Sequence, residues 1–197
     1  MLLSLLLAVP ADGTARPLKA GEAEAIFAAG CFWCVESAFD DVPGVIEAVS
    51  GYTGGATPKP TYAQVGAGAT GHTEAVRVIF DPRKVTYEKL LDIYWHNVDP
   101  YDAGGQFCDR GSQYRPAIFT VGDAQARAAE VSKAAVTSRL GRPVVVPIAP
   151  AGPFWDAEAY HQDYHRTHAL KYGYYRWACG RDARLAEVWA TPEKPAR

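Results

Sequence analysis

The sequence predicts a mixed fold of the α/β or α+β class, in which a small sheet carries its helices largely on one side. Segments with strand-like apolar runs or alternation mix along the chain with segments whose apolar residues recur at helical spacing. The connections between most of these segments are short. No internal repeat or linker divides the 197 residues, so the chain suits one globular domain with some tail.

The first predicted elements are a strand, a helix and a second strand. The apolar run at residues 23–30 ends in a glycine and is typical of a buried strand. From Cys31 onward, apolar side chains recur at spacings of three and four, which predicts a helix that the Pro-Gly pair at 43–44 terminates. Residues 45–52 are expected to form the second strand.

The middle of the chain adds a long loop, a strand and a helix. Residues 51–72 are rich in glycine, and an irregular segment this long in a compact domain is usually functional or disordered. Residues 72–82 alternate in polarity and predict a strand. Residues 86–99 predict a helix that Thr86 opens.

The last third is expected to hold two strands, two helices and a long irregular C-terminal tail. Asp123 is the predicted cap of the first of these helices, and Gly141 is placed to end it. After residue 168 the chain is aromatic and charged with little periodicity. In order, we expect a loop over 101–114, a strand over 115–122, a helix over 123–139, a strand over 142–150 and a helix over 154–168.

Composition excludes two classes of function. The formal charge is −2, the pI is near 6.2, and the basic residues form no long block, so nothing indicates nucleic-acid binding. No stretch of 18 or more apolar residues is present, so no membrane-spanning helix is expected.

The N-terminus predicts a leader. Residues 2–9 are apolar and small residues follow near Ala11, which favours an export signal, although basic residues are missing before the run. We therefore divide the chain into a signal peptide or disordered leader at 1–20 and one catalytic domain at 21–197. A periplasmic or exported location follows from this reading, with a cytoplasmic one as the alternative.

Four cysteines are too few and too scattered to staple a small domain, which favours a chemical role. Cys31 falls at the start of a predicted helix, where free N–H groups and the dipole lower a thiol pKa. Cys34 lies one turn on, within reach of a disulfide. Two buried core cysteines are the simpler alternative. Cys108 and Cys179 stand alone, so a zinc site made of two cysteine pairs is disfavoured.

Glu74 is the strongest candidate for an acid. Strand alternation places it on the apolar face of residues 72–82, and burial raises a carboxyl pKa so that the group stays protonated. Reduction of an S=O bond needs such a proton donor beside the thiol. A solvated carboxylate at the start of the strand is the alternative. Tyr62 and Tyr114, in the two glycine-bearing loops, are placed to donate hydrogen bonds to the same oxygen.

Three histidines at residues 161, 165 and 168 would share one face of the helix predicted at 154–168. No acidic partner completes a known ligand pattern around them, and tyrosines interleave with them. We expect His161, His165 and His168 to be surface or packing residues, and we expect no metal and no cofactor.

Several segments together resemble one family, and they occur in that family's order over about residues 26–165. They are "GCFWCVESAFDDVPGVIEAVSGYTGG", "PTYAQV", "TGHTEAVRVIFDP", "DRGSQYRPAIF" and "YHQDY". The chain resembles the peptide methionine sulfoxide reductases of the A type. The resemblance implies a two-layer α+β sandwich with a ferredoxin-like core. It also implies reduction of methionine (S)-sulfoxide, free or in proteins, as a repair reaction.

The resemblance assigns roles to individual residues. Cys31 would attack the sulfoxide sulfur and become a sulfenic acid, and Glu74 would protonate the oxygen. Phe32 and Trp33 would form the pocket for the substrate methyl group. Tyr62 and Tyr114 would orient the oxygen, with Asp109 supporting the polar side.

A second cysteine would then form a disulfide with Cys31, and a thioredoxin-like reductant would reduce it. Cys34 is the expected resolving cysteine because it is adjacent in the helix, with Cys179 as an alternative or a relay. Cys108 is expected to be a packing residue. A monomer is expected, with oxidised proteins and the reductant as its partners.

Two rival functions remain at this point. A general dithiol-disulfide oxidoreductase would explain Cys31 and Cys34 but leave Glu74, Tyr62 and Tyr114 without roles. A non-catalytic module with a histidine-bound metal is the second rival.

Overall fold

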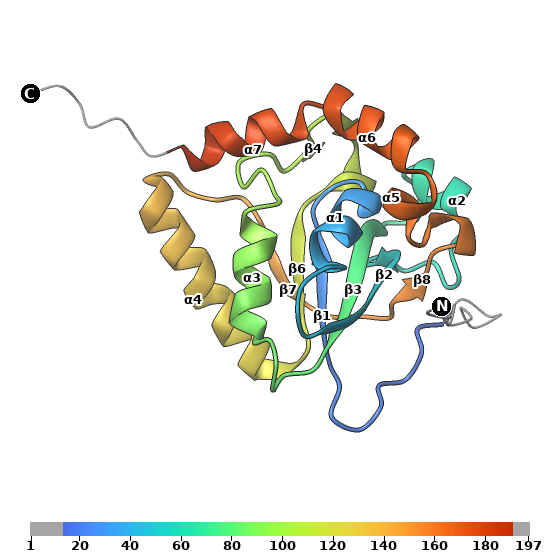
Figure 1. Ribbon diagram of the computed structural model, residues 1–197, viewed down its shortest axis with the longest axis horizontal. Helices are drawn as coiled ribbons and strands as arrows, with labels where there is room; N and C mark the ends of the chain where they lie inside the picture. The colour runs from blue at the N-terminus through green and yellow to red at the C-terminus, as the bar shows by residue number, and fades with distance from the viewer. Residues whose placement is uncertain (1–13, 191–197) are drawn as a thin grey trace, which may run out of the picture.

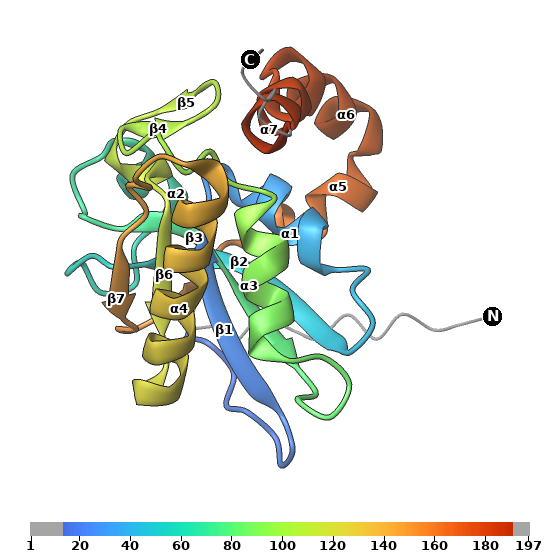
Figure 2. The ribbon, with the colours of Figure 1, turned by 90° about the vertical axis from the view of Figure 1, so that its left-hand side faces the viewer.

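The computed structural model describes residues 14–190, through which runs a six-stranded mixed sheet in the order β7-β6-β1-β3-β2-β8 (Figure 1). A separate two-stranded hairpin, β4-β5, lies beyond the end of this sheet (Figure 2). The strands of the main sheet are β1 Ala23–Ala28, β2 Val45–Thr53, β3 Thr73–Phe80, β6 Ala117–Thr120, β7 Ile148–Pro150 and β8 Trp155–Asp156. Those of the hairpin are β4 Gly105–Gln106 and β5 Asp109–Arg110.

The four central strands have the ferredoxin-like arrangement. Their order is β6-β1-β3-β2, and every neighbouring pair among them is antiparallel. Helix α1, Phe32–Phe39, connects β1 to β2, and helix α3, Tyr87–Trp95, follows β3. The predicted α+β class and its ferredoxin-like core are therefore confirmed. At the edges of the sheet, β7 pairs with β6 in parallel orientation, and β8 pairs with β2 in antiparallel orientation.

Three helices cover one face of the sheet, as Figure 2 shows. They are α1, α3 and α4, the last spanning Gly122–Leu140. Phe27 on β1 stacks with Phe39 of α1 and Tyr94 of α3, at ring-centroid distances of 5.2 and 5.1 Å. The opposite face is covered by extended chain, with Phe154 packed over the strands. The helices therefore lie largely on one side of the sheet, as the sequence predicts.

The helices predicted at 31–42 and 86–99 are confirmed, with shorter ends. Thr86 caps α3, because its side chain accepts a hydrogen bond from the Lys89 backbone N–H at 3.2 Å. Helix α4 ends at Gly141, whose φ of 65° is left-handed, as expected. It begins at Gly122 with Val121 as the cap, so the prediction of an Asp123 cap was wrong by two residues.

The long loop at 51–72 contains a short helix. Helix α2, Tyr62–Gly66, begins with a capping box in which Thr61 and Gln64 exchange side-chain-to-backbone hydrogen bonds. The strand predicted at 142–150 pairs only over its last three residues. Pro143 and Pro147 lack the N–H group that a central strand needs, which shortens it.

The prediction of one helix over residues 154–168 was wrong. That segment instead forms β8, a 3₁₀ turn η2 at Ala159–His161 and a short helix α5 at Tyr164–Thr167. The break falls at Asp163, whose φ is 52°, and whose backbone N–H donates to Glu36 Oε1 at 2.5 Å. A buried carboxylate of α1 thus overrides the local helical periodicity.

The prediction of an irregular C-terminal tail was also wrong. It forms helices α6, Ala169–Ala178, and α7, Arg181–Trp189, which lie across the end of the sheet near α1 (Figure 1). Large apolar residues on α6, such as Leu170 and Trp177, are exposed, which disguises the helical pattern in the sequence. On α7 only Arg181, Leu185 and Val188 are buried.

The predicted leader at 1–20 lies partly outside the described residues, which begin at 14. From there the chain runs against the domain. Thr14 forms a β-bridge with Trp155, and Arg16 Nε lies 2.7 Å from Glu47 Oε2. Across residues 14–190, none of the helices has the length and apolar character that crossing a membrane requires.

Candidate active site

The site residues meet at one end of the sheet because β1 is antiparallel to both neighbours. The register pairs Phe27 with Val76 on β3 and Ala28 with Ala117 on β6. The end of β1 therefore lies beside the starts of β3 and β6. This brings Cys31 together with Glu74 and with the 3₁₀ turn η1, Ser112–Tyr114, that precedes β6.

Cys31 occupies the cap position of α1, and the turn before it depends on a glycine. Gly30 has a φ of 83°, and a Cβ there would lie 2.6 Å from the Gln106 side chain. Cys31 is buried, with 5% of its surface exposed. The thiol therefore sits at the helix N-terminus, as the sequence predicts.

Glu74 lies beside this turn. Its Oε2 accepts a hydrogen bond from the Phe32 backbone N–H at 3.0 Å, and the residue is 3% exposed. Burial raises the pKa of Glu74 to about 8, and the nearby Asp109 and Cys34 charges add to the rise. Glu74 is therefore buried, as the sequence predicts, and its raised pKa favours the protonated acid near neutral pH.

Cys31 and Cys34 are both free thiols and both buried. Burial raises the pKa of Cys31 above its ordinary value, while the pKa of Cys34 falls to about 6. The main cause of the fall is a hydrogen bond from the Cys31 thiol, followed by the positive charges of Arg181 and Arg176. The sequence placed the thiolate on Cys31, but in the resting pair Cys34 has the lower pKa, because the Cys31 thiol donates a hydrogen bond to it and the arginines add positive charge.

The predicted polar residues gather around the same point. The pKa of Tyr62 is raised to about 12 by burial and by the charges of Glu74 and Cys31, and the pKa of Tyr114 is raised by burial and the Glu74 charge. Burial also raises the pKa of Asp109, which accepts a hydrogen bond from the Cys31 backbone N–H. All three residues thus lie within electrostatic reach of the thiol and the acid.

The predicted methyl pocket is aromatic on several sides. Phe32 is buried, and its ring lies 6.4 Å from that of Tyr62. Trp33 is half-buried and stacks on Tyr164 at 3.8 Å. The Trp33 indole N–H donates to His161 Nδ1 at 3.1 Å, which fixes the orientation of both rings.

The three histidines do not share a helix face. His161 belongs to η2, His165 to α5, and His168 is the residue after α5. His161 is 2% exposed and packs against the Phe32 ring at 4.9 Å, so it is part of the aromatic pocket. His165 Nε2 lies 3.3 Å from Asp40 Oδ2.

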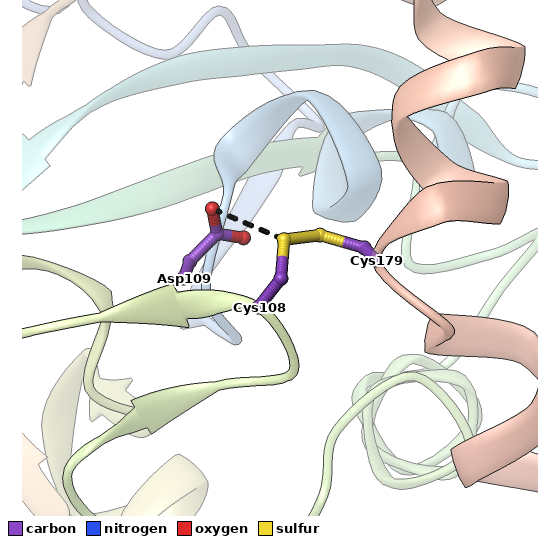
Figure 3. A group of neighbouring side chains, drawn as sticks. All are labelled: Cys108, Asp109 and Cys179. Atoms are coloured by element: carbon purple, nitrogen blue, oxygen red, sulfur yellow. Dashed lines mark hydrogen bonds between the residues drawn. A yellow bond between two sulfur atoms is a disulfide. The ribbon is translucent and has the colours of Figure 1, made fainter.

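Cys108 and Cys179 form a disulfide, with their Cα atoms 4.9 Å apart (Figure 3). It joins the turn of the β4-β5 hairpin to the end of α6. Cys108 is exposed, so the expectation of a packing residue was wrong. Its sulfur lies 3.8 Å from Asp109 Oδ1, which places the disulfide at the rim of the site (Figure 3).

Within residues 14–190, two groups have metal-ligand chemistry, and neither presents a free donor set. In the first, Cys108, Asp109 and Cys179, both sulfurs are committed to the disulfide. In the second, Glu36, Asp40 and His165, both Glu36 oxygens already accept hydrogen bonds, from the Ser50 hydroxyl and the Asp163 N–H.

Sequence reasoning missed the C-terminal contribution to the site. Tyr175 on α6 donates to Asp109 Oδ2 at 2.5 Å and also contacts the Cys31 thiol. Arg176 and Arg181 supply the positive charge beside Cys34. No local pattern marks these residues, because they reach the site only after α6 and α7 fold back over α1.

The fold and the site define a class of protein. A ferredoxin-like α+β domain carries two adjacent buried thiols, one of them a thiolate, next to a carboxylic acid that stays neutral near pH 7. This arrangement is that of a thiol-dependent oxidoreductase with its own proton donor.

Comparisons with known proteins give the family. The family model described as peptide methionine sulfoxide reductase matches residues 23–193. A relative from Rhizobium meliloti named peptide methionine sulfoxide reductase MsrA 2 is 48% identical over 88% of this chain and 87% of its own length. The enzyme MsrA of Bacillus licheniformis is 49% identical over 84% of this chain and 92% of its own.

Solved structures agree. Methionine sulfoxide reductase A of Corynebacterium diphtheriae is 34% identical and superposes with a TM-score of 0.74 over 77% of each chain. Reduced Mxr1 from Saccharomyces cerevisiae is 27% identical, with a TM-score of 0.73 over 78% of this chain and 90% of its own. The chain belongs to the peptide methionine sulfoxide reductase family and is an oxidoreductase.

Proposed function

We propose that the site reduces methionine (S)-sulfoxide, in proteins and free, with Cys31 as nucleophile and Glu74 as proton donor. The observation that carries the proposal is the buried Glu74 carboxyl, held 3.0 Å from the backbone N–H that follows Cys31 and neutral below about pH 8. A disulfide oxidoreductase has no need of such an acid, whereas removal of a sulfoxide oxygen does.

The reaction begins with two buried thiols that share one negative charge. Substrate entry shifts the proton between them so that the Cys31 sulfur attacks the sulfoxide sulfur. Glu74 gives its proton to the oxygen, and Tyr62 and Tyr114 donate hydrogen bonds to it. The oxygen passes to Cys31 as a sulfenic acid, and methionine leaves, so the substrate sulfur is reduced and Cys31 is oxidised.

Cys34 then acts as the resolving cysteine. After the proton shift Cys34 carries the proton, and its pKa of about 6 lets it release this proton near neutral pH. The resulting thiolate attacks the Cys31 sulfenic sulfur, an S–S bond forms, and the hydroxyl takes up a proton and leaves as water. Cys179 is the alternative resolver, and it would first have to be released from Cys108.

A thioredoxin-like dithiol is the proposed donor that reduces the Cys31–Cys34 bond. The yeast protein Mxr1 has also been solved in complex with Trx2, in a structure 20% identical to this chain with a TM-score of 0.52. We also propose that the enzyme acts as a monomer.

An exported location is proposed over the cytoplasmic alternative. The Cys108–Cys179 disulfide supports it, because disulfides persist in oxidising compartments. The reductant would then also have to be exported.

A single-turnover assay tests the function. Protein with free Cys31 and Cys34 is mixed, without reductant, with a peptide carrying one epimer of methionine sulfoxide. We expect one methionine per enzyme from the S epimer, none from the R epimer, and a Cys31–Cys34 disulfide by mass spectrometry. The Cys31→Ser variant is the control and should form none.

The rival disulfide oxidoreductase is tested in the same preparation with insulin as substrate. Reduction of insulin without formation of methionine would overturn the proposed function. A Cys31–Cys179 disulfide after turnover would keep the function and move the resolving role to the C-terminal helices.

A further inference from the structure

Arg181, the first residue of α7, is a buried cation that forms no direct ion pair with a carboxylate among residues 14–190. It is 1% exposed, and its Nη2 donates to the carbonyl oxygens of Ala29 and Asn97 at 3.1 and 2.6 Å. Among residues 14–190, it forms no ion pair with a carboxylate, and its Nε has no hydrogen-bond partner. A buried charge is costly unless an opposite charge lies near, so a counter-charge is needed.

Other arginines of the C-terminal helices show the contrast. Arg176 pairs with Asp182 at 2.5 Å, and Arg184 pairs with Asp99 at 2.7 Å. Each of these side chains also keeps part of its surface in solvent. Arg181 is thus the most deeply buried of the three, and its hydrogen bonds go only to neutral carbonyl oxygens.

The guanidinium of Arg181 lies beneath the turn that carries the two thiols. Ala29, whose carbonyl it binds, is two residues before Cys31. A Cβ at Gly30 would lie 3.8 Å from Arg181 Nη1. The negative groups within its electrostatic reach are the Cys34 thiolate and Asp109.

The Cys108–Cys179 disulfide spans the place where Arg181 is held. The guanidinium lies 4.4 Å from the centre of the Phe107 ring, a cation–π contact. Phe107 precedes Cys108, and Cys179 is two residues before Arg181, so the disulfide joins the segments on the two sides of that contact. Gly180, between them, has a left-handed φ of 65° at the turn from α6 to α7.

We infer that Arg181 is a positioning residue whose charge is balanced by the Cys31–Cys34 thiol pair, and that the Cys108–Cys179 disulfide holds it there. The inference rests on the proposed function in one respect only, the resolving role of Cys34. In that step the Cys34 thiolate attacks the Cys31 sulfenic sulfur, the S–S bond forms and water leaves. A fixed positive charge keeps Cys34 ionised for this attack.

Other groups also face Cys34, and the test has to separate them from Arg181. The Cys31 thiol donates to it, Glu74 lies near, and burial opposes its charge. From α6, Tyr172 donates a hydrogen bond and Arg176 adds a positive charge that Asp182 partly balances. Arg181 is the remaining charged group.

The experiment titrates the thiolate by its ultraviolet absorbance in substrate-free protein with the Cys108–Cys179 disulfide intact. Only Cys31 and Cys34 are then free, so the signal reports the pair. In Arg181→Met we expect the midpoint to rise by about one pH unit, and disulfide formation after one turnover to slow about fivefold at pH 6. Arg181→Lys should restore most of the midpoint, because it keeps the charge.

Arg184→Met, on the same helix with its own acidic partner, is the matched control and should leave the midpoint in place. The double variant Cys108→Ser/Cys179→Ser should shift the midpoint in the same direction as Arg181→Met, by a smaller amount. If Arg181→Met does not fold, the midpoints of Arg181→Lys and of Cys108→Ser/Cys179→Ser still test the inference.

An unchanged midpoint in folded Arg181→Met would overturn the inference, and so would equal shifts in the lysine and methionine variants. An unchanged midpoint in the double-serine variant would overturn the role of the disulfide. Failure of the proposed function is distinguishable, because it appears as absent methionine in the wild-type protein and leaves the titration unaffected.

Discussion

At the scale of single residues, the site depends on where two protons reside. Glu74 holds a proton because burial raises its pKa to about 8, and Cys34 loses one because the Cys31 thiol and nearby positive charges lower its pKa to about 6. Between these values, the acid is protonated and the thiol pair carries one negative charge. The pH range in which both conditions hold therefore defines where the chemistry runs.

The first prediction concerns Glu74. Glu74→Gln should slow formation of the sulfenic acid by about 100-fold or more, since general acid catalysis is worth at least that much. In the wild-type protein, the same step should decline as pH rises through about 8, because Glu74 ionises there. Rapid-quench measurement of methionine formation across pH checks both expectations.

Exposed Glu88 on α3 offers the matched control, and Glu88→Gln should behave like the wild type. Substrate affinity should change little in Glu74→Gln, since the amide still fills the site. A wild-type rate in Glu74→Gln would remove this residue from the acid role.

The second prediction concerns Cys34. Cys34→Ser should release one methionine per enzyme and then stop, because no thiolate remains beside Cys31 to resolve the sulfenic acid. A sulfenic-acid trap followed by mass spectrometry should label Cys31. Steady turnover of this variant with a thioredoxin would instead assign resolution to Cys179, and replacing Cys108 and Cys179 as well would then abolish it.

At the scale of elements, Glu36 connects α1 to the segment that follows β8. Its carboxyl accepts from the Ser50 hydroxyl on β2 and from the Asp163 backbone N–H, and it is 1% exposed. Gln162 adds to this connection by bonding the Ser50 backbone through both atoms of its amide. The aromatic pocket residues His161 and Tyr164 are positioned by these contacts.

The third prediction is a pH dependence of stability. Burial raises the pKa of Glu36 to about 8, so between its unfolded value and about 8 the folded state binds the additional proton. Its stabilising contribution is therefore complete at pH below the unfolded pKa and is lost as pH rises towards 8. Asp40, with a pKa raised to about 7, acts in the same direction.

Glu36→Gln removes this titration, so the variant should lose less stability than the wild type between pH 5 and pH 8, at about 1.4 kcal/mol per unit of pKa shift removed. Chemical denaturation at a series of pH values measures it. Glu130→Gln, at an exposed position of α4, should retain the wild-type slope. Parallel slopes in Glu36→Gln and the wild type would contradict the prediction.

At the scale of the whole molecule, the Cys108–Cys179 disulfide connects the hairpin at the end of the sheet to the two C-terminal helices. Within residues 14–190, much of α6 is exposed, so this part of the structure has fewer buried apolar side chains than the sheet and its three covering helices. The disulfide therefore contributes much of the stability that holds α6 and α7 in place over the thiols.

The fourth prediction follows from this connection. The bond closes a loop of 71 residues, for which chain entropy alone gives about 4 kcal/mol, an upper figure when the cleaved state retains structure. Cys108→Ser/Cys179→Ser should therefore unfold at a lower temperature than the oxidised wild type. Thermal denaturation with and without reductant checks it. Reductant should lower the wild-type transition towards that of the variant and leave the variant unmoved.

Local sequence patterns predicted the central elements and the first residues of the site. Apolar alternation over 72–82 placed Glu74 on a buried face, and helical spacing after Gly30 placed Cys31 at a helix start. These signals are local, since side-chain periodicity follows directly from backbone geometry. The ferredoxin-like core, in contrast, was predicted only through the resemblance of several motifs to a known family, and local periodicity gave no more than the α/β or α+β class.

The role of the last third of the chain depends on contacts that form when the chain folds. The Glu36 carboxyl group interrupts the helix predicted at 154–168, and Cys108 forms a disulfide with Cys179. Arg181 binds the turn that carries the thiol pair, although it lies far from that turn in the sequence. Such contacts depend on charge and packing between segments that are distant in sequence, so local periodicity cannot predict them. For the same reason, the sequence placed the lower thiol pKa on Cys31, whereas in the folded protein the hydrogen bond from the Cys31 thiol and the nearby arginines lower the pKa of Cys34.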